Sequence, residues 1–338
     1  MRKLASIQKI KSIEPIEGAD AIVKATVLGW HLVVKKDEFK VGDLCVYCEI
    51  DSLLPDKPEF EFLKPRNMRI RTIKLRGQIS QGICFPLSIL PGGFEIAEDA
   101  DCTEALGIIK YEPPVPAHLA GIAKGKFPGF MPKTDETRVQ VLQDVLDKYA
   151  GEKCYLTEKL DGSSVTYYFR NGEFGVCSRN LELVIDPENS YCKFAHENDL
   201  ENKLKSLNGN FALQGEIVGE GIQKNILKLR GQTVYFFNIF DIDKYEYVPY
   251  EESKKMLANF DLKMVPIISE NYTLTNDIEI IVRDATIKSS VNPEAWAEGI
   301  VIRPFNENLD TRDVSEYFTK GRVSFKAINP EFLLKYGE

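Results

Sequence analysis

A lysine followed closely by an acidic residue and a glycine is the first group in the sequence with the means to do chemistry. The stretch Glu158-Lys159-Leu160-Asp161-Gly162 follows a short apolar segment that we expect to be a strand. A lysine amine at a strand end becomes a nucleophile once its pKa falls from about 10.4, and neighbouring cations or desolvation lower it. The same residue types also meet by chance, and a surface turn is the alternative interpretation. The stretch alone does not establish a site.

Other charged or polar residues stand at the ends of apolar segments further along the chain, or within them. Burying a charge is costly unless the group is paired or binds a ligand. The pattern therefore predicts one polar site shared by several strands. Its candidate members are Arg179, Glu216, Asp241, Glu298, Arg303 and Lys326.

The elements that would position these residues mix strands and helices. Residues 165–170 and 173–178 flank Asn171-Gly172, a strong hairpin signal. Buried strands are expected at 211–218, 234–242 and 299–303, and amphipathic helices near 192–207 and 250–260. The order lacks a regular βαβ alternation, so the sequence predicts the α+β class with antiparallel sheets flanked by helices.

The first part of the chain is predicted to be a separate β-rich domain. About five short strands without helical periods precede residue 110, which favours an OB-like barrel, with a sandwich or an SH3-like barrel as alternatives. The Pro-rich stretch that follows predicts a linker. We therefore expect an OB-like nucleic-acid-binding domain at 1–110, a linker at 111–126 and a second domain at 127–338. A length of 338 residues fits two domains.

Net charge alone argues against a nucleic-acid partner, because 51 acidic residues outnumber 43 basic ones and the formal charge is −8. The distribution of charge indicates otherwise. Residues 64–76 hold six cations and no acidic residue, and 68–76 alternates apolar and basic residues like a strand with one positive face. We expect Arg69, Arg71 and Lys74 to contact nucleic acid, with a solvated face as the alternative.

Cysteine content and hydropathy indicate in which cellular compartment the protein is expected. Seven scattered cysteines argue against a disulfide framework and favour a reducing compartment. No run of 18 apolar residues and no apolar leader core occurs, so neither a membrane span nor a signal peptide is expected. We expect a cytoplasmic protein, or a nuclear one if the source is eukaryotic.

Taken in order, these residues resemble the covalent nucleotidyltransferases and, within them, the ATP-dependent RNA ligases of the type-2 group. Lys159-Leu160-Asp161-Gly162 matches the nucleophile motif, and the later motifs follow in the family's order at Arg179, Glu216, Phe240-Asp241, Glu298-Gly299 and Lys326. The run at 221–225 resembles RNA ligases more than DNA ligases or capping enzymes. A barrel ahead of these motifs suggests the branch that includes the Deinococcus and Naegleria RNA ligases.

The resemblance implies roles for the matched residues. Lys159 would attack the α-phosphorus of ATP and carry AMP, with Lys326 on the α-phosphate. Asp161, Glu216 and Glu298 would hold Mg²⁺ or Mn²⁺ through water. The nucleotide would be bound by a further set comprising Glu158, Leu160, Gly162, Arg179 and Phe240, with Phe237 as the second candidate for stacking on adenine. Arg138 is a further candidate for the nucleotide phosphates, and a salt bridge at a helix start is its alternative.

Two positions depart from the family pattern. Ser164 stands where an Asn is usual, and it is expected to contact the 5′-phosphate of the nucleic acid with a shorter reach. Ile328 stands where a second lysine is usual. Either Lys326 acts alone, or Arg322 or Lys320 supplies the second cation.

The predicted function is an RNA ligase that seals 3′-OH and 5′-phosphate ends in three steps, acting as a monomer on RNA ends or a nicked duplex in RNA repair. One alternative is a non-catalytic OB-fold RNA-binding protein with a vestigial nucleotidyltransferase domain. A DNA ligase or a capping-type enzyme is the other. Those enzymes usually carry a further barrel after the last motif, whereas only 12 residues follow Lys326.

Overall fold

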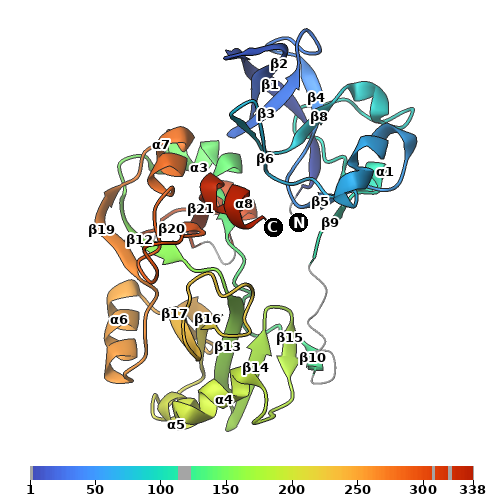
Figure 1. Cartoon of the computed structure of the whole chain (residues 1–338). Coiled ribbons are helices and arrows are strands. Elements are labelled where there is room, and N and C mark those ends of the chain that lie inside the picture. The colour runs from blue at the N-terminus through green and yellow to red at the C-terminus, as the bar shows by residue number, and fades with distance from the viewer. Residues whose placement is uncertain (1–2, 113–122, 307–308, 319–321, 338) are drawn as a thin grey trace. The chain divides into compact units, whose positions relative to one another are not determined.

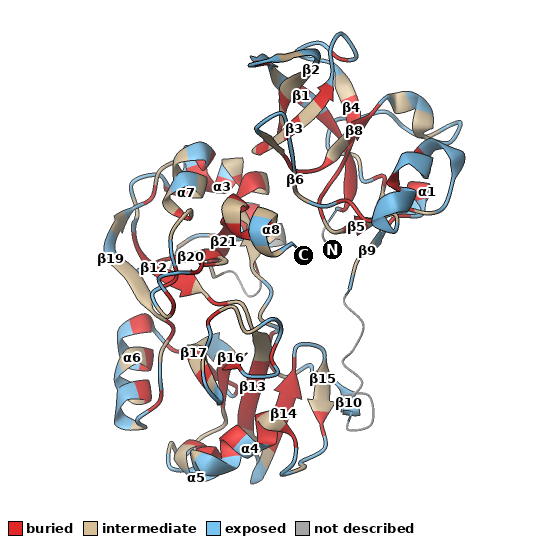
Figure 2. Cartoon of the chain, in the orientation of Figure 1, coloured by how far each residue is buried: buried red, intermediate tan, exposed pale blue. Residues whose placement is uncertain are grey.

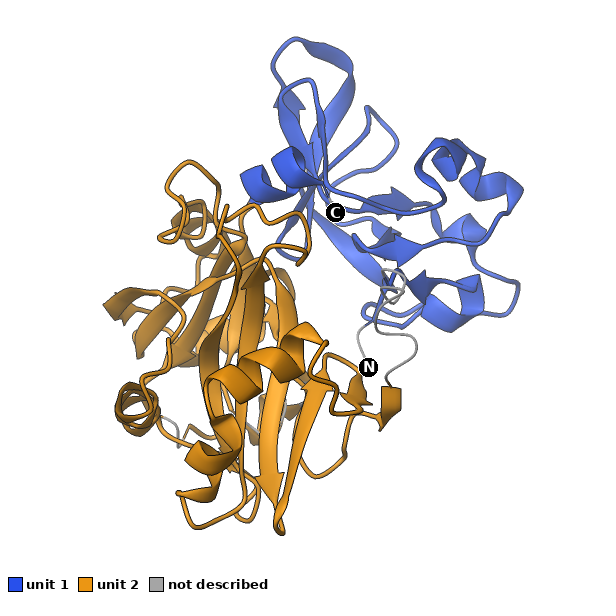
Figure 3. Cartoon of the chain, turned by 60° about the horizontal axis from the view of Figure 1, so that its bottom comes forward, with its two compact units in different colours: residues 1–114, 330–338 blue, residues 115–329 orange. Residues whose placement is uncertain are grey.

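The computed structural model describes residues 3–112, 123–306, 309–318 and 322–337. The chain divides into two compact units, residues 1–114 with 330–338 and residues 115–329 (Figure 3). The sequence-based division kept 330–338 with the second domain. The predicted linker at 111–126 lies mostly outside the described residues, and its last four residues form strand β10 (Ala123–Lys126).

The first unit is built on a five-stranded antiparallel sheet of order β3-β2-β1-β4-β8. Its long strand β1 (Ala5–Ile16) pairs with strands on both sides. These strands are β2 (Ala19–Val27) and β4 (Leu44–Cys48). Strand β3 (Trp30–Lys35) pairs with β2, and β8 (Ile83–Phe85) pairs with β4. Apolar side chains such as Ile7, Trp30 and Leu32 are fully buried in its core.

Short elements complete the first unit. Two-stranded sheets join β5 (Ser52–Leu53) to β9 (Ile109–Lys110) and β6 (Ile73–Leu75) to β7 (Gln78–Ser80). The helical elements are η1 (Pro58–Arg66), η2 (Leu87–Ile89), α1 (Thr103–Leu106) and α8 (Pro330–Tyr336). The prediction of a strand at 68–76 is wrong for residues 68–72. Only Ile73–Leu75 forms a strand, and Met68 has a positive φ of 60°.

The second unit contains two larger sheets (Figure 1). The seven-stranded sheet has the order β10-β15-β14-β13-β16-β17-β18. Beyond β10, its strands are β13 (Ser163–Arg170), β14 (Glu173–Ser178), β15 (Leu181–Leu183), β16 (Phe211–Gly219), β17 (Gln232–Asp241) and β18 (Glu246–Tyr247). The predicted hairpin is present, since Asn171 and Gly172 both take positive φ in the turn between β13 and β14.

The five-stranded sheet has the order β11-β21-β20-β12-β19. Its strands are β11 (Thr137–Arg138), β12 (Lys153–Lys159), β19 (Ile267–Thr273), β20 (Gly299–Pro304) and β21 (Phe325–Ile328). The helical elements of the second unit are η3 (Val139–Val141), α3 (Gln143–Tyr149), α4 (Ser190–Glu197), α5 (Leu200–Lys205), α6 (Tyr250–Asn259), α7 (Ile278–Asp284) and η4 (Arg312–Tyr317).

Each sheet of the second unit has one face covered by helices, and the buried residues of the strands follow this arrangement (Figure 2). Helices α4, α5 and α6 add apolar side chains to the core of the seven-stranded sheet. Helices α3 and α7 do the same for the five-stranded sheet. The other faces carry polar residues together with two smaller apolar clusters. Arg303 in β20 links the two sheets by donating to the backbone oxygen of Phe237 in β17 at 3.5 Å. The predicted α+β class with antiparallel sheets is confirmed.

Candidate active site

The nucleophile candidate lies where two strands place a lysine beside a carboxylate. Lys159 ends β12, and its antiparallel partner is Gly299, the first residue of β20. This register puts Glu298 next to Lys159, and the Lys159 Nζ lies 2.6 Å from Glu298 Oε2. Both side chains are partly buried, with exposed fractions of 25% and 15%. Sequence positions 139 residues apart thus form one charged pair.

Glu216 is the second carboxylate of the site. It lies on β16 opposite Ser164 of β13. Burial raises the pKa of Glu216 to about 8, and the negative charges of Glu298 and Asp161 act in the same direction, while Lys159 opposes them. Three carboxylates therefore lie close enough to disfavour one another's ionised forms.

The backbone after the nucleophile packs tightly on β16. A Cβ added at Gly162 would lie 2.4 Å from the Ile217 backbone oxygen, so a larger residue there would force the chain to shift. The same segment has a second neighbour, because Gln223 donates a hydrogen bond of 3.1 Å to the Gly162 carbonyl. The loop that carries Asp161 is therefore fixed between two neighbours.

Two further cations flank the nucleophile. In β21, Lys326 pairs with Val301 of β20 on one side and with Arg138 of β11 on the other. The pKa of Lys326 is lowered to about 7, mainly by burial and then by the positive charge of Lys159, with a smaller contribution from Arg138; Asp135 acts in the opposite direction. Lys326 and Arg138 thus supply a positive site beside Lys159.

The position of the family's second lysine lies in the core. Ile328 pairs with Gly299 and is 3% exposed. Of the two replacement candidates, Lys320 lies outside the described residues. Arg322 instead donates to Asn238 Oδ1 at 3.0 Å and to the Tyr155 hydroxyl at 3.1 Å.

An apolar cluster next to the nucleophile is a candidate pocket for a base. Leu160 packs there with Val218, Leu227 and Phe237. Glu158 is 2% exposed; its Oε2 accepts a hydrogen bond from the Ser290 backbone N–H, whereas its buried Oε1 accepts none from the described residues. A buried carboxylate oxygen beside an apolar cluster fits the amino group of a purine.

The prediction that Phe240 stacks on adenine is wrong. Phe240 is fully buried, opposite Ala212 of β16, and its ring packs edge-on against Tyr245 and Tyr247. The register of β16 and β17 shifts between Gln214 and Gly215, and this bulge sets Phe237 against the Leu160 cluster instead. Sequence spacing alone does not reveal such a shift.

Arg179 and Ser164 both contact the segment at 133–136. Arg179 donates to Asp135 Oδ1 at 2.7 Å, and both side chains are more than half exposed. The Ser164 and Thr134 hydroxyl oxygens lie 2.7 Å apart. The sequence assigns no role to residues 133–136, because their mixture of Lys, Thr and acidic residues is not specific for any site; only Arg138, just after them, is a sequence-based candidate.

In the first unit, the predicted nucleic-acid residues separate into two kinds. Arg69 is buried, pairs with Asp51 Oδ1 at 2.8 Å and lies over the Tyr111 ring at 3.7 Å from its centroid, so its predicted contact with nucleic acid is wrong. Arg71 and Lys74 are exposed, before and within β6.

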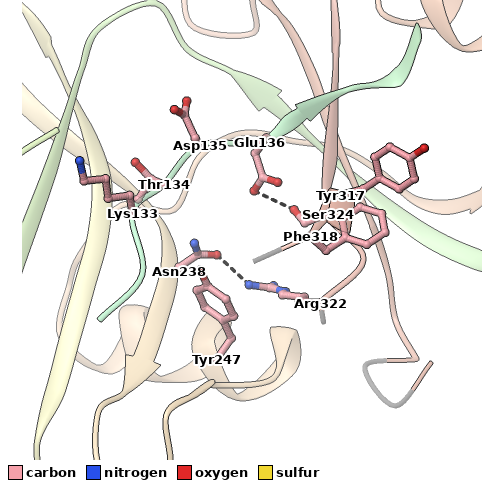
Figure 4. Close-up of a pocket in the computed structure, with 10 residues that line it drawn as sticks. All are labelled: Lys133, Thr134, Asp135, Glu136, Asn238, Tyr247, Tyr317, Phe318, Arg322 and Ser324. Atoms are coloured by element: carbon pink, nitrogen blue, oxygen red, sulfur yellow. Dashed lines mark hydrogen bonds between the residues drawn. The ribbon is translucent and has the colours of Figure 1, made fainter. Parts of the chain in front are cut away.

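A polar pocket in the second unit lies along the segment at 133–136 (Figure 4). Glu136 accepts hydrogen bonds from Ser324 at 2.7 Å and from Arg303 Nη2 at 3.1 Å. Arg322 lines the same pocket with its guanidinium 4.4 Å from the centroid of the Tyr247 ring. The sequence marks Arg303 as one of several charged strand residues, but only the fold shows that it pairs with Glu136.

Comparisons with known proteins identify the family. An RNA ligase family model matches residues 152–328, and an OB-fold domain model matches residues 4–87. The solved Naegleria gruberi RNA ligase with PPi is 39% identical, with 98% of each chain covered and a TM-score of 0.88. A variant of that ligase with ATP and Mn is 38% identical, with 98% of each chain covered and a TM-score of 0.88. A comparison with curated proteins found no match.

The chain belongs to the RNA ligase family. This confirms the resemblance drawn from the order of the motifs, and it confirms an RNA ligase over the DNA ligase and capping-enzyme alternatives. The OB-fold match confirms the predicted class of the N-terminal domain. Among the described residues, no helix is both long and apolar enough to span a membrane.

Proposed function

We propose that this RNA ligase uses ATP and Mg²⁺ or Mn²⁺ and joins 3′-OH and 5′-phosphate RNA ends through AMP carried on Lys159. The observation that carries the proposal is the placement of Lys159 Nζ 2.6 Å from Glu298, with Lys326 beside it. Solved relatives with ATP, AMP and Mn support the choice of nucleotide and metal.

The first reaction is nucleotidyl transfer to the lysine. The Lys159 ammonium first gives up a proton, and Glu298 Oε2 is the nearest carboxylate oxygen that can accept it. The neutral amine then attacks the α-phosphorus of ATP. A P–N bond forms, the bond to the β-phosphate oxygen breaks, and pyrophosphate leaves. Lys326 and Arg138 offset the negative charge that builds on the phosphate oxygens.

A base and a divalent cation both fit the residues present. The buried Glu158 Oε1 is matched to the adenine amino group, and guanine would present an oxygen acceptor to it. No three His, Cys, Asp or Glu side chains in the described ranges are arranged to hold a metal directly. Asp161, Glu216 and Glu298 would therefore hold Mg²⁺ or Mn²⁺ through water, and the cation would neutralise phosphate charge.

The second and third reactions use the RNA ends. The 5′-phosphate attacks the lysine-bound AMP, releasing the lysine, and the 3′-OH then attacks the capped 5′ end and releases AMP. Ser164 is the nearest candidate for the incoming 5′-phosphate, because its strand register places it opposite Glu216. Sealing of nicked duplexes that differ only in the sugar at the 3′-OH end tests the preference for RNA at that end.

Two broader features complete the proposal. We expect the protein to act as a monomer, which sedimentation tests. All seven cysteines are buried free thiols, which supports a reducing compartment such as the cytoplasm or nucleus. A role in RNA repair follows from the ends that such a ligase joins.

The lysine is tested by Lys159→Ala, incubated with ATP labelled at the α-phosphate and Mg²⁺ or Mn²⁺. The wild-type protein should gain label and the variant none. Lys153→Ala, at the exposed opposite end of the same strand, is the matched control and should label normally. A labelled adduct on Lys159→Ala would assign the nucleophile to another residue.

A further inference from the structure

Asn329 is a buried polar residue to which the proposed reaction gives no role. It directly follows β21 and is fully buried. Its Nδ2 donates to the Ala297 backbone oxygen at 3.0 Å and to the Ile287 backbone oxygen at 3.3 Å. Its backbone N–H donates to the Glu298 backbone oxygen at 2.9 Å. A buried amide is costly unless it is hydrogen-bonded, and these bonds all end on the segment that leads into the candidate active site.

The backbone around Glu298 is held where the sheet ends. The last strand pair between β20 and β21 joins Gly299 to Ile328. Asn329 continues this pairing by one residue, because its N–H reaches the oxygen of Glu298, the residue before Gly299. A Cβ added at Gly299 would lie 2.1 Å from the Ala327 backbone oxygen, so the two chain segments approach each other closely here. This close approach brings the backbone of Glu298 within reach of Asn329.

The side-chain amide of Asn329 acts on the peptide that carries Glu298. The Ala297 oxygen belongs to the planar peptide that joins Ala297 to Glu298, so a hydrogen bond to this oxygen fixes the plane of the peptide. The direction of the Glu298 side chain depends on this plane. Glu298 Oε2 lies 2.6 Å from Lys159 Nζ, and a rotation of the peptide would lengthen that contact. Asn329 therefore acts on the charged pair through one intervening residue.

The loop that leads to Glu298 has a support of its own. Its ends are joined by a hydrogen bond of 3.0 Å from the Ala297 N–H to the Ile287 oxygen, which does not involve the amide of Asn329. Within this loop, Val291 packs against the apolar cluster that is the candidate pocket for a base. Loss of the Asn329 amide should therefore alter the direction of Glu298 more than the shape of the base pocket.

We propose that Asn329 is a positioning residue for lysine adenylation, which holds Glu298 in the direction that contacts Lys159. Because Asn329 is fully buried, it acts through the backbone and not on the nucleotide itself. Pro330 supports this placement, since a residue before proline favours an extended backbone and so continues the direction of β21. The inference rests on the proposed function, because it concerns the reaction of Lys159.

The test compares Asn329→Ala with Asn329→Ser, whose hydroxyl keeps one donor. The rate of lysine adenylation at saturating ATP should fall about tenfold in Asn329→Ala and less in Asn329→Ser, while the KM for ATP changes little. Asn198→Ala is the matched control, because the Asn198 amide also donates to a backbone oxygen, that of Phe194 at 2.9 Å, at the end of α4. This control should adenylate at the wild-type rate. Circular dichroism sets a temperature at which every variant is folded.

A double-mutant cycle with Glu298→Ala separates positioning from a general structural role. If Asn329 acts through Glu298, Asn329→Ala should lower the residual single-turnover rate of Glu298→Ala by less than about twofold. Asn329→Ser serves in the same cycle if Asn329→Ala does not fold. An equal loss in both backgrounds, or a similar loss in Asn198→Ala, would overturn the positioning role.

The failure of this inference is distinguishable from the failure of the proposed function. Absence of label on the wild type, or label on Lys159→Ala, contradicts the proposed function. Normal labelling of the wild type together with an unchanged rate in Asn329→Ala contradicts only the role of Asn329.

Discussion

The charge of Lys326 depends strongly on its surroundings. Its pKa of about 7 follows first from burial and then from the neighbouring cations Lys159 and Arg138. In the empty site the ammonium is therefore lost as pH rises through 7. A bound polyphosphate favours the charged form, so binding of nucleotide and binding of a proton to Lys326 support each other.

This linkage predicts a pH dependence of nucleotide affinity. The affinity for α,β-methylene-ATP, which cannot transfer AMP, should fall about tenfold between pH 6 and pH 8 at constant salt and metal. Lys326→Arg keeps its charge throughout this range and should bind with a flatter profile. Isothermal titration calorimetry at several pH values measures both. Equal slopes in the two proteins would assign the titration to another group.

Phe237 and Phe240 provide a test at the scale of the element, because the β16–β17 bulge separates their environments. Phe237→Ala should raise the KM for ATP several-fold with a small loss of stability. Phe240→Ala should lower the free energy of unfolding by about 3 kcal/mol and leave the KM unchanged, since its ring is fully buried away from Leu160. Denaturant unfolding measures the stability of each variant, and adenylation kinetics measure its KM for ATP. A raised KM in Phe240→Ala but not in Phe237→Ala would restore the prediction that Phe240 stacks on adenine.

The segment around β6 gives a second prediction at this scale. Arg71→Gln with Lys74→Gln should weaken RNA binding and reduce the slope of log K against log salt by about 1 to 2. Lysine adenylation and stability should be unaffected, because both side chains are exposed.

Arg69→Gln should behave differently from this pair. It leaves Asp51 without its buried partner, so the free energy of unfolding should fall by about 2 kcal/mol or more. RNA binding should change only as far as stability does. A lower salt slope in Arg69→Gln, at normal stability, would show that Arg69 does contact RNA.

Sequence patterns predict much of the structure of the second unit, because these patterns depend on residues that are close together in the sequence. The Asn171-Gly172 turn, the apolar strands and the ordered charged residues all come from short-range chemistry. The buried state of Arg69 depends on Asp51 and Tyr111, and the position of Phe237 depends on a bulge against a different strand. These features arise only when distant segments meet, so no local pattern encodes them.

At the scale of the whole molecule, the excess of acidic residues conceals a division of charge. Asp161, Glu216 and Glu298 gather at one site, while Arg71 and Lys74 lie exposed in the other unit. A net charge of −8 therefore averages over regions of opposite charge. The acidic groups that we propose to hold a metal and the basic groups that we propose to contact RNA lie in different units of one chain.

The assembly of the site from remote strands has a kinetic consequence. Lys159 meets Glu298 across 139 residues, and Arg138 meets Lys326 across a parallel pair of strands. Contacts this distant in sequence form late and slowly during folding. After dilution from denaturant, the capacity to form the lysine adduct should return with the slowest refolding phase, after most of the circular dichroism signal has recovered. Labelling with ATP at timed intervals checks this order, and recovery in the earliest phase would contradict it.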